Sequence, residues 1–126
     1  MENSPKAVVE KMFAAFGSGD LDKFADTVSE DTVWIYHGTQ IIPRSIFEKK
    51  EGARNFLSNI LKLTEIISFE PLQYMVEGKM VVVLGREHQR IKRSGRELKQ
   101  QWVQIYTVEN GLITRMEEFA SSEEVS

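Results

Sequence analysis

The chain is poor in residues that would supply covalent or metal chemistry. It has no cysteine, which excludes disulfides, thiolate nucleophiles and cysteine-ligated zinc sites. Its two histidines, His37 and His88, lack companion ligands at diagnostic spacing. We therefore expect no metal and no cofactor, and we expect each histidine to be a surface or structural residue.

Long apolar runs and an excess of one charge are also missing. No stretch approaches the ~20 apolar residues of a membrane span, and the N-terminal MENSPKAVVEK lacks the apolar segment of a signal peptide. The net charge is only −3, so neither nucleic acid nor a membrane is expected as a partner. The basic hairpin around Ser94-Gly95 is expected to be a solvated tip. These absences indicate a soluble, cytoplasmic protein.

The composition is that of an ordinary globular domain. Hydrophobic residues make up 41% and charged residues 28% of the 126 residues, which is enough for one packed core. We expect a single domain over residues 1–126, with an ordered core at about 5–120 and a frayed polar tail at 121–126.

The clearest local signal is a β-hairpin within Gln101–Phe119. Asn110-Gly111 lies between two runs of aromatic and β-branched residues, and both residues tolerate the positive φ of a tight turn. Side chains alternate along a strand. Trp102, Gln104 and Tyr106 therefore point to one face of the strand, and Val103 and Ile105 point to the other. Both sets are partly apolar, so we expect both faces of this strand to be covered.

Helical patterns dominate the N-terminal half and strand patterns the C-terminal half. Helices are predicted from Ser4-Pro5 to Gly17-Ser18-Gly19, from Asp20 to Glu30-Asp31, and over Glu51–Glu65. Strands are predicted at Thr32–His37, Ile66–Glu77, Lys79–Arg93, Arg96–Val108 and Leu112–Phe119. Gly38–Lys50 reads as loop with a little edge strand. The predicted fold is α+β, with three N-terminal helices against a curved, mainly antiparallel sheet.

Three segments resemble the nuclear transport factor 2-like superfamily, in its SnoaL-like and ketosteroid-isomerase-like branch. They are GSGDLDKFADTVSEDTVW, EGARNFLSNIL and GRELKQQWVQIYTVENGLITRMEEF. The resemblance implies a cone-shaped barrel (a cystatin-like roll) with an apolar pocket for a small hydrophobic or aromatic molecule. It also implies a homodimer through the outer sheet face. In that arrangement Val103 and Ile105 would face the interior of the cone, and Trp102, Gln104 and Tyr106 would face the partner.

The family's catalytic positions can be carried over by counting along the chain. The base, the first-helix tyrosine and the acid of ketosteroid isomerases correspond to Tyr36, Met12 and Val103. None of the three supplies the required group, so the steroid isomerase triad is absent. The aspartates of limonene-epoxide-hydrolase-like members correspond to Glu87 and Ser121, and their arginine to Gly85. SnoaL-like cyclases often carry aspartate at the place of Ser121.

Glu87 is the best acid/base candidate, because burial of a carboxylate disfavours its charged form. The alternative is a solvated strand end. We expect Tyr36 to line the pocket and orient a ligand, while the inward member of the pair Glu117 and Glu118 stays open because strands in this fold carry bulges. The predicted pocket lining is Met12, Phe16, Tyr36, Phe56, Val103, Ile105, Phe119 and Ser121. The function is then isomerase-, cyclase- or hydrolase-like acid/base catalysis, or alternatively a non-catalytic small-ligand-binding or dimerisation module.

Overall fold

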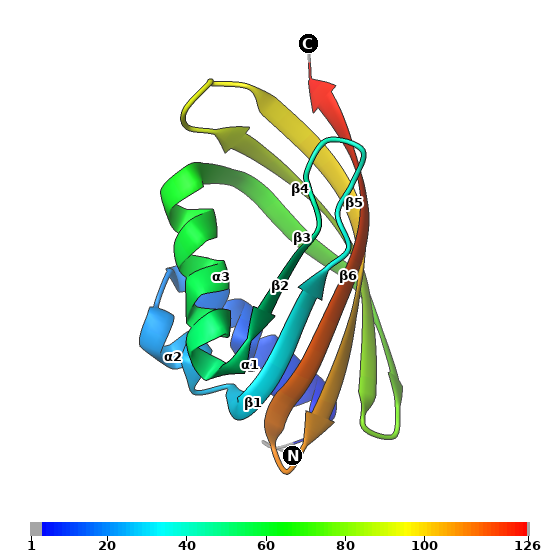
Figure 1. The fold of residues 1–126 in the computed structure, drawn as a ribbon. Helices are drawn as coiled ribbons and strands as arrows, with labels where there is room; N and C mark the ends of the chain where they lie inside the picture. The colour runs from blue at the N-terminus through cyan, green and yellow to red at the C-terminus, as the bar shows by residue number, and fades with distance from the viewer. Residues whose placement is uncertain (1–3, 126) are drawn as a thin grey trace.

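Three helices pack on one face of a six-stranded sheet that curves around them without closing (Figure 1). This arrangement comes from a computed structural model that describes residues 4–125. The α+β class and the grouping of the helices on one side of the sheet are those predicted from the sequence. Within the described residues, no helix is both long enough and apolar enough to cross a membrane.

The first two helices begin and end at the residues that local rules favour. The α1 helix (Pro5–Ser18) begins after Ser4, whose hydroxyl accepts the backbone N–H of Ala7, and ends at Gly19 with φ 69°. Asp20 caps the α2 helix (Leu21–Ala25) by accepting the backbone N–H of Lys23 at 3.0 Å. The α2 helix is shorter than expected, because Val28 already belongs to the first strand.

The sheet combines one parallel pair of strands with an antiparallel meander. Its strand order is β2-β1-β6-β5-β4-β3, and only β1 and β6 run parallel. The α3 helix (Lys49–Leu63) connects β2 to β3. The strand bounds are Val28–Tyr36 for β1, Ser45–Glu48 for β2, Thr64–Glu77 for β3, Met80–Ile91 for β4, Glu97–Glu109 for β5 and Leu112–Val125 for β6.

The end of the chain differs from the prediction. Residues 121–126 were expected to be a frayed tail, but β6 continues to Val125 and pairs with the first residues of β5. Arg96 also contacts the carboxylate of Glu124. Polar composition is therefore compatible with a paired strand here, because the outward side chains are solvated. Ser126 lies outside the described residues.

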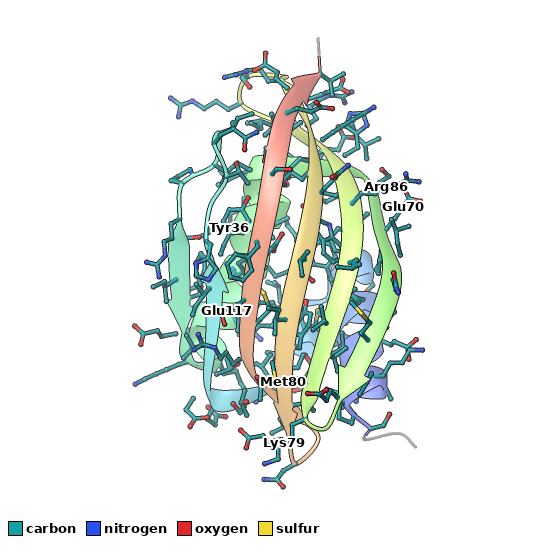
Figure 2. All side chains as sticks on the ribbon, turned by 90° about the vertical axis from the view of Figure 1, so that its right-hand side faces the viewer. Tyr36, Glu70, Lys79, Met80, Arg86 and Glu117 are labelled. Carbon is teal, nitrogen blue, oxygen red and sulfur yellow. The ribbon has the colours of Figure 1, made fainter. Side chains whose placement is uncertain are left out.

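The orientation of β5 is the reverse of the prediction. Trp102, Gln104 and Tyr106 are buried against the helices, and Val103 and Ile105 lie on the outer face (Figure 2 shows this face with the helices behind it). Phe119, which pairs with Val103, also faces outward and is 46% exposed. Because both alternating sets contain apolar residues, hydrophobicity alone did not distinguish the two faces. The helices cover the set with the larger aromatic rings.

The core between helices and sheet is built from aromatic rings. Trp34 packs between Phe24 and Phe56, with ring centroids 5.3 and 5.4 Å away. Phe13 lies 5.6 Å from Phe69 and 6.0 Å from Tyr106. These contacts attach α1, α2 and α3 to the same face of the sheet.

Candidate functional site

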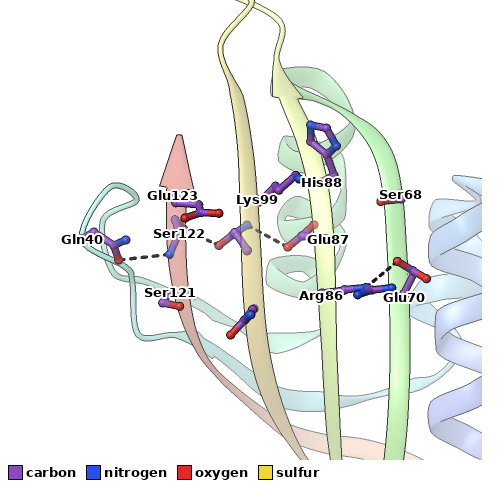
Figure 3. A pocket seen from close by; sticks show the side chains of 12 residues that line it. Gln40, Ser68, Glu70, Arg86, Glu87, His88, Lys99, Ser121, Ser122 and Glu123 are labelled. Carbon is purple, nitrogen blue, oxygen red and sulfur yellow. Dashed lines mark hydrogen bonds and ion pairs between the residues drawn. The ribbon is translucent and has the colours of Figure 1, made fainter. Parts of the chain in front are cut away.

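A polar row crosses the inner face of β4, β5 and β6. Glu87, Gln100 and Ser122 are cross-strand neighbours, and Gln100 joins them: its amide N–H donates to Glu87 at 3.0 Å and its carbonyl accepts from Ser122 at 3.1 Å. Tyr36 of β1 donates its hydroxyl to the same carbonyl at 2.8 Å. Gln100 therefore connects the two residues proposed from the sequence, Tyr36 and Glu87. Figure 3 shows Glu87 and Ser122 on neighbouring sides of this row, with dashed lines running from each toward the strand between them.

A second polar row lies further along the same face. Gln104 of β5 donates to the carboxyl of Glu118 on β6 at 3.1 Å, and Tyr106 donates to the carbonyl of Gln104 at 2.5 Å. Glu118 is the register partner of Tyr36 on β1, which places the two rows side by side. We call the six residues of both rows together with Tyr36 the inner polar network: Tyr36, Glu87, Gln100, Gln104, Tyr106, Glu118 and Ser122.

The two carboxyls of the inner polar network have strongly shifted proton affinity. Burial raises the pKa of Glu87 to about 7. Burial, and after it the charge of Glu87, raises the pKa of Glu118 to about 8, against a smaller lowering by the hydrogen bond from Gln104. Burial first, and nearby carboxylates second, also raise the pKa of the Tyr36 and Tyr106 hydroxyls. Near neutral pH the site thus offers neutral phenol donors beside carboxyls that can gain or lose a proton.

The remaining pocket residues predicted from the sequence divide into two groups. Met12, Phe16 and Phe56 lie on the helix side of the sheet, where Met12 is fully buried and Phe56 packs on Trp34. Four others were placed on the inner wall and instead face outward: Val103, Ile105, Phe119 and Ser121. Because side chains alternate along a strand, the residues next to them on β5 and β6 face the helices instead.

The outward orientation of Val103 and Ser121 means that they do not occupy the catalytic positions of the relatives. An oxyanion donor must reach the interior, so outward-facing Val103 is a poor counterpart for the isomerase acid. The inner positions of β5 beside it are Trp102 and Gln104. In the same way Ser122, and not Ser121, is the serine of β6 that joins the inner polar network. Counting without structure was off by one residue on both strands.

Sequence reasoning left the choice between Glu117 and Glu118 open and missed both glutamines. Glu118 is 4% exposed and inward, whereas Glu117 faces outward and pairs with His37 at 2.8 Å. A register shift between Thr107 and Val108 changes the cross-strand partners by one residue. Counting back from Asn110-Gly111 without that shift pairs Gln104 with Glu117, and the shift makes Glu118 its partner.

A hollow of about 620 Å³ lies over the upper half of the sheet (Figure 3). Most of its side chains belong to the outward set, including the ion pair of Arg86 and Glu70 at 2.9 Å. Its lining residues are Gln40, Ser68, Glu70, Arg86, Glu87, His88, Lys99, Gln100, Gln101, Ser121, Ser122 and Glu123. Glu87, Gln100 and Ser122 belong to both the hollow and the inner polar network. Among residues 4–125, no cluster of three or more potential metal ligands occurs.

Comparison with known proteins agrees with this architecture. An NTF2-like protein from Burkholderia xenovorans is 26% identical over 92% of this chain and 88% of its own length, with a TM-score of 0.82. A ketosteroid isomerase-like fold from Catenulispora acidiphila, in complex with trimethylamine, is 12% identical over 89% of this chain and 83% of its own, with a TM-score of 0.77. TerC, co-crystallised with polyporic acid, is 20% identical over 92% and 91%, with a TM-score of 0.75.

The last two likenesses concern the fold alone, because their identities are low. No curated protein matches the chain. The model of the SnoaL-like domain matches residues 9–116, which is most of the sequence. The chain therefore belongs to the SnoaL-like domain family, within the NTF2-like superfamily.

Proposed function

We propose that this protein is an acid/base enzyme acting on a small hydrophobic or aromatic molecule, with Glu87 as the proton-transferring group and Tyr36 as an orienting donor. The observation that carries the proposal is the link between them: Tyr36 and Glu87 both hydrogen-bond to Gln100 inside an otherwise aromatic interior. A polar network in such surroundings is costly to maintain unless every member is paired. A chemical role accounts for its presence.

The reaction class that fits is proton removal from carbon next to a carbonyl group. The C–H bond breaks, its proton goes to the carboxylate of Glu87, and the electron pair moves to the carbonyl oxygen as an enolate. A pKa of about 7 suits Glu87 to accept that proton and return it near neutral pH. Glu118, with a pKa of about 8, is mostly protonated at neutral pH and can donate a hydrogen bond to negative charge.

The comparisons support a small organic ligand in general terms. One similar structure holds trimethylamine and another polyporic acid. In this chain the aromatic side chains around the network, such as Phe13, Phe16 and Phe56, favour a ligand with apolar rings.

The test uses 2-tetralone, a flat fused-ring ketone with exchangeable hydrogens beside its carbonyl. In D2O, wild-type protein should accelerate hydrogen–deuterium exchange at these carbons, followed by NMR of the ketone. Glu87→Gln should lower the rate by about 100-fold or more, the usual contribution of a positioned base. Tyr36→Phe should lower it less. Glu117→Gln, on the outer face, serves as the matched control and should exchange at the wild-type rate.

A second candidate function is a non-catalytic small-ligand-binding module. It is favoured by the dense ring packing around Trp102, where Phe69 stacks at 5.0 Å and Phe13 lies at 6.3 Å. If 2-tetralone binds but its exchange rate stays at that of buffer, the binding module is correct and the enzyme proposal is wrong. If 2-tetralone does not bind at all, the inner site is not a pocket for this class of molecule.

We also propose a homodimer through the outer sheet face, with corrected contact residues. The outward apolar side chains cluster on the central strands, and we call them the outer apolar patch: Val82, Leu84, Val103, Ile105 and Phe119. Met80 beside them is 44% exposed (labelled in Figure 2). Phe119 is exposed and the other four side chains are half-buried. A contiguous apolar surface that solvent still reaches is typical of an interaction site.

A further inference from the structure

The indole N–H of Trp102 is a buried donor with no hydrogen-bond acceptor among residues 4–125. The side chain is 2% exposed, and buried polar groups in folded proteins are nearly always paired. Trp34, the other tryptophan, follows that rule, because its indole nitrogen donates to the Thr32 hydroxyl at 3.2 Å. An acceptor brought by a ligand would therefore gain a hydrogen bond at Trp102 without displacing one within the protein.

Trp102 lies inside the inner polar network. Its inner-face neighbours along β5 are Gln100 and Gln104, which hold the carboxyls of Glu87 and Glu118. Trp102 is therefore the inner position of β5 between the glutamine that contacts the proposed base, Glu87, and the glutamine that contacts the proposed hydrogen-bond donor, Glu118.

Small residues on the neighbouring strands leave space for the indole ring. The cross-strand partners of Trp102 are Gly85 on β4 and Ala120 on β6. A Cβ atom on Gly85 would meet ring carbon Cζ2 of Trp102 at 2.2 Å. The absence of a side chain at Gly85 therefore lets the indole lie flat over β4.

A line of aromatic rings connects Trp102 with the edge of the core. Phe69 stacks on Trp102 with centroids 5.0 Å apart and an interplanar angle of 20°, and Phe16 lies 4.8 Å from Phe69. Phe16 and Phe69 are half-buried. We call Trp102, Phe69 and Phe16 the aromatic stack. Offset stacked and tilted contacts of this kind are also the contacts that a flat ligand ring makes with aromatic side chains.

We propose that Trp102 is a specificity-determining residue whose indole N–H donates to the carbonyl oxygen of a flat, ring-bearing ketone bound against the aromatic stack. This inference rests on the proposed function and names its substrate class. As Glu87 takes the proton from carbon, negative charge develops on that oxygen, and a donor already in place stabilises it. The indole stays protonated over the physiological range, so the donor itself adds no pH dependence.

The first test is NMR of ¹⁵N-labelled wild-type protein, whose two tryptophans give two indole N–H resonances. Titration with 2-tetralone should move the Trp102 resonance downfield and leave that of Trp34 in place. Tetralin has the same fused rings without the oxygen and should produce no downfield shift at Trp102. Equal shifts with both compounds would overturn the inference, because ring contact alone would then explain them.

The second test compares affinities for the same two compounds. Trp102→Phe keeps a ring in the aromatic stack but removes the donor, so 2-tetralone should bind about fivefold to tenfold more weakly, the effect of one hydrogen bond. Tetralin affinity should be unchanged. Trp34→Phe, which removes the paired indole, should leave the preference for 2-tetralone intact. Thermal unfolding of both variants verifies that they are folded.

The outcomes separate this inference from the proposed function. If Trp102→Phe weakens both compounds equally, the ring and not its N–H matters, and the inference fails while ligand binding stands. If wild type accelerates exchange of 2-tetralone with no change at the Trp102 resonance, the inference again fails alone. If wild type binds neither compound, the inference and the proposed pocket fail together.

Discussion

Glu118 is a carboxyl whose surroundings favour its protonated form. It is 4% exposed, it accepts a hydrogen bond from the neutral amide of Gln104, and no cation pairs with it among the described residues. By contrast, Glu117, one residue earlier, pairs with His37, and the hydrogen bond from that histidine lowers its pKa. The pKa values of these adjacent glutamates are thus shifted in opposite directions, because their side chains lie on opposite faces of the sheet.

Replacing Glu118 with glutamine should change how stability depends on pH. The pKa of Glu118 is about 8 in the folded protein against 4.5 for an ordinary glutamate. Its favourable contribution is therefore complete below about pH 4.5 and is lost as the pH rises through 8. Glutamine stays neutral, so Glu118→Gln should match wild type near pH 4.5. At pH 9 it should be more stable by up to about 5 kcal/mol, from the difference between a pKa of about 8 and one of 4.5 at 1.36 kcal/mol per pKa unit, measured by urea denaturation.

Glu117→Gln is the control for this prediction, and its effect on stability should depend on pH in the opposite direction. Glu117 has a lowered pKa, so its stabilising contribution is present above the ordinary glutamate pKa and is lost as the pH falls. Glu117→Gln should therefore lose stability at neutral pH and approach wild type in acid. Parallel denaturation curves for Glu118→Gln and wild type from pH 4.5 to 9 would contradict a perturbed carboxyl at position 118.

At the level of secondary structure, the sequence predicts well what is decided locally. Ser4, Asp20 and Gly19 set the ends of the first two helices through their own side chains or a positive φ. Asn110 and Gly111 have φ values of 53° and 78°, as the hairpin requires. Each of these signals involves residues within one turn of each other, so no tertiary information is needed.

The face of a strand is decided by tertiary packing and was predicted wrongly for β5. Its inner positions include Gln100 and Gln104, which look like surface residues in the sequence. They are inside because each pairs with a carboxyl on a neighbouring strand, and those partners lie 13 and 14 residues away. Polarity patterns assume that buried positions are apolar. That assumption fails where a polar network occupies the interior.

Position 85 in the middle of β4 must be glycine for the indole of Trp102 on β5 to pack against β4. A Cβ at Gly85 would lie 2.2 Å from the indole of Trp102 and 2.7 Å from the backbone oxygen of Glu70 on β3. Gly85→Ala should therefore destabilise the protein by about 3 kcal/mol, the upper range for overpacking a core. Urea denaturation measures this change, and loss of 2-tetralone binding should accompany it.

Gly17→Ala is the matched control for Gly85→Ala. A Cβ at Gly17 in α1 would meet no atom within 4 Å, and alanine favours helix over glycine by up to about 1 kcal/mol. This variant should be as stable as wild type or slightly more stable. If Gly85→Ala is equally harmless, the indole of Trp102 does not lie flat over β4.

At the scale of the whole molecule, the sheet separates two different surfaces. The inner face carries the polar network under the helices. The outer face carries the outer apolar patch at its centre and the charged hollow above it. Successive side chains of β5 point to opposite faces of the sheet. A substitution at one residue therefore probes the inner polar network, and a substitution at the next residue probes the outer face.

Val103→Arg tests the proposed homodimer and the corrected orientation of β5 together. The arginine would project from the centre of the outer apolar patch, where it is solvated in a monomer and desolvated in a dimer. In sedimentation experiments at micromolar concentration, wild type should be dimeric and Val103→Arg monomeric. Its fold and its affinity for 2-tetralone should be retained, because the side chain points away from the inner polar network.

Two comparisons make this prediction decisive. Gln101→Arg adds the same charge on the same face of β5, in the exposed hollow beyond the patch, and should remain dimeric. Gln104→Arg places the charge at a position that is 6% exposed on the inner face, and should unfold the protein because a buried unpaired charge is strongly destabilising.

A wild-type monomer, or a Val103→Arg variant that still dimerises, would exclude the outer apolar patch as the interface. Unfolding of Val103→Arg with a folded Gln104→Arg would instead mean that the two faces of β5 are assigned the wrong way round.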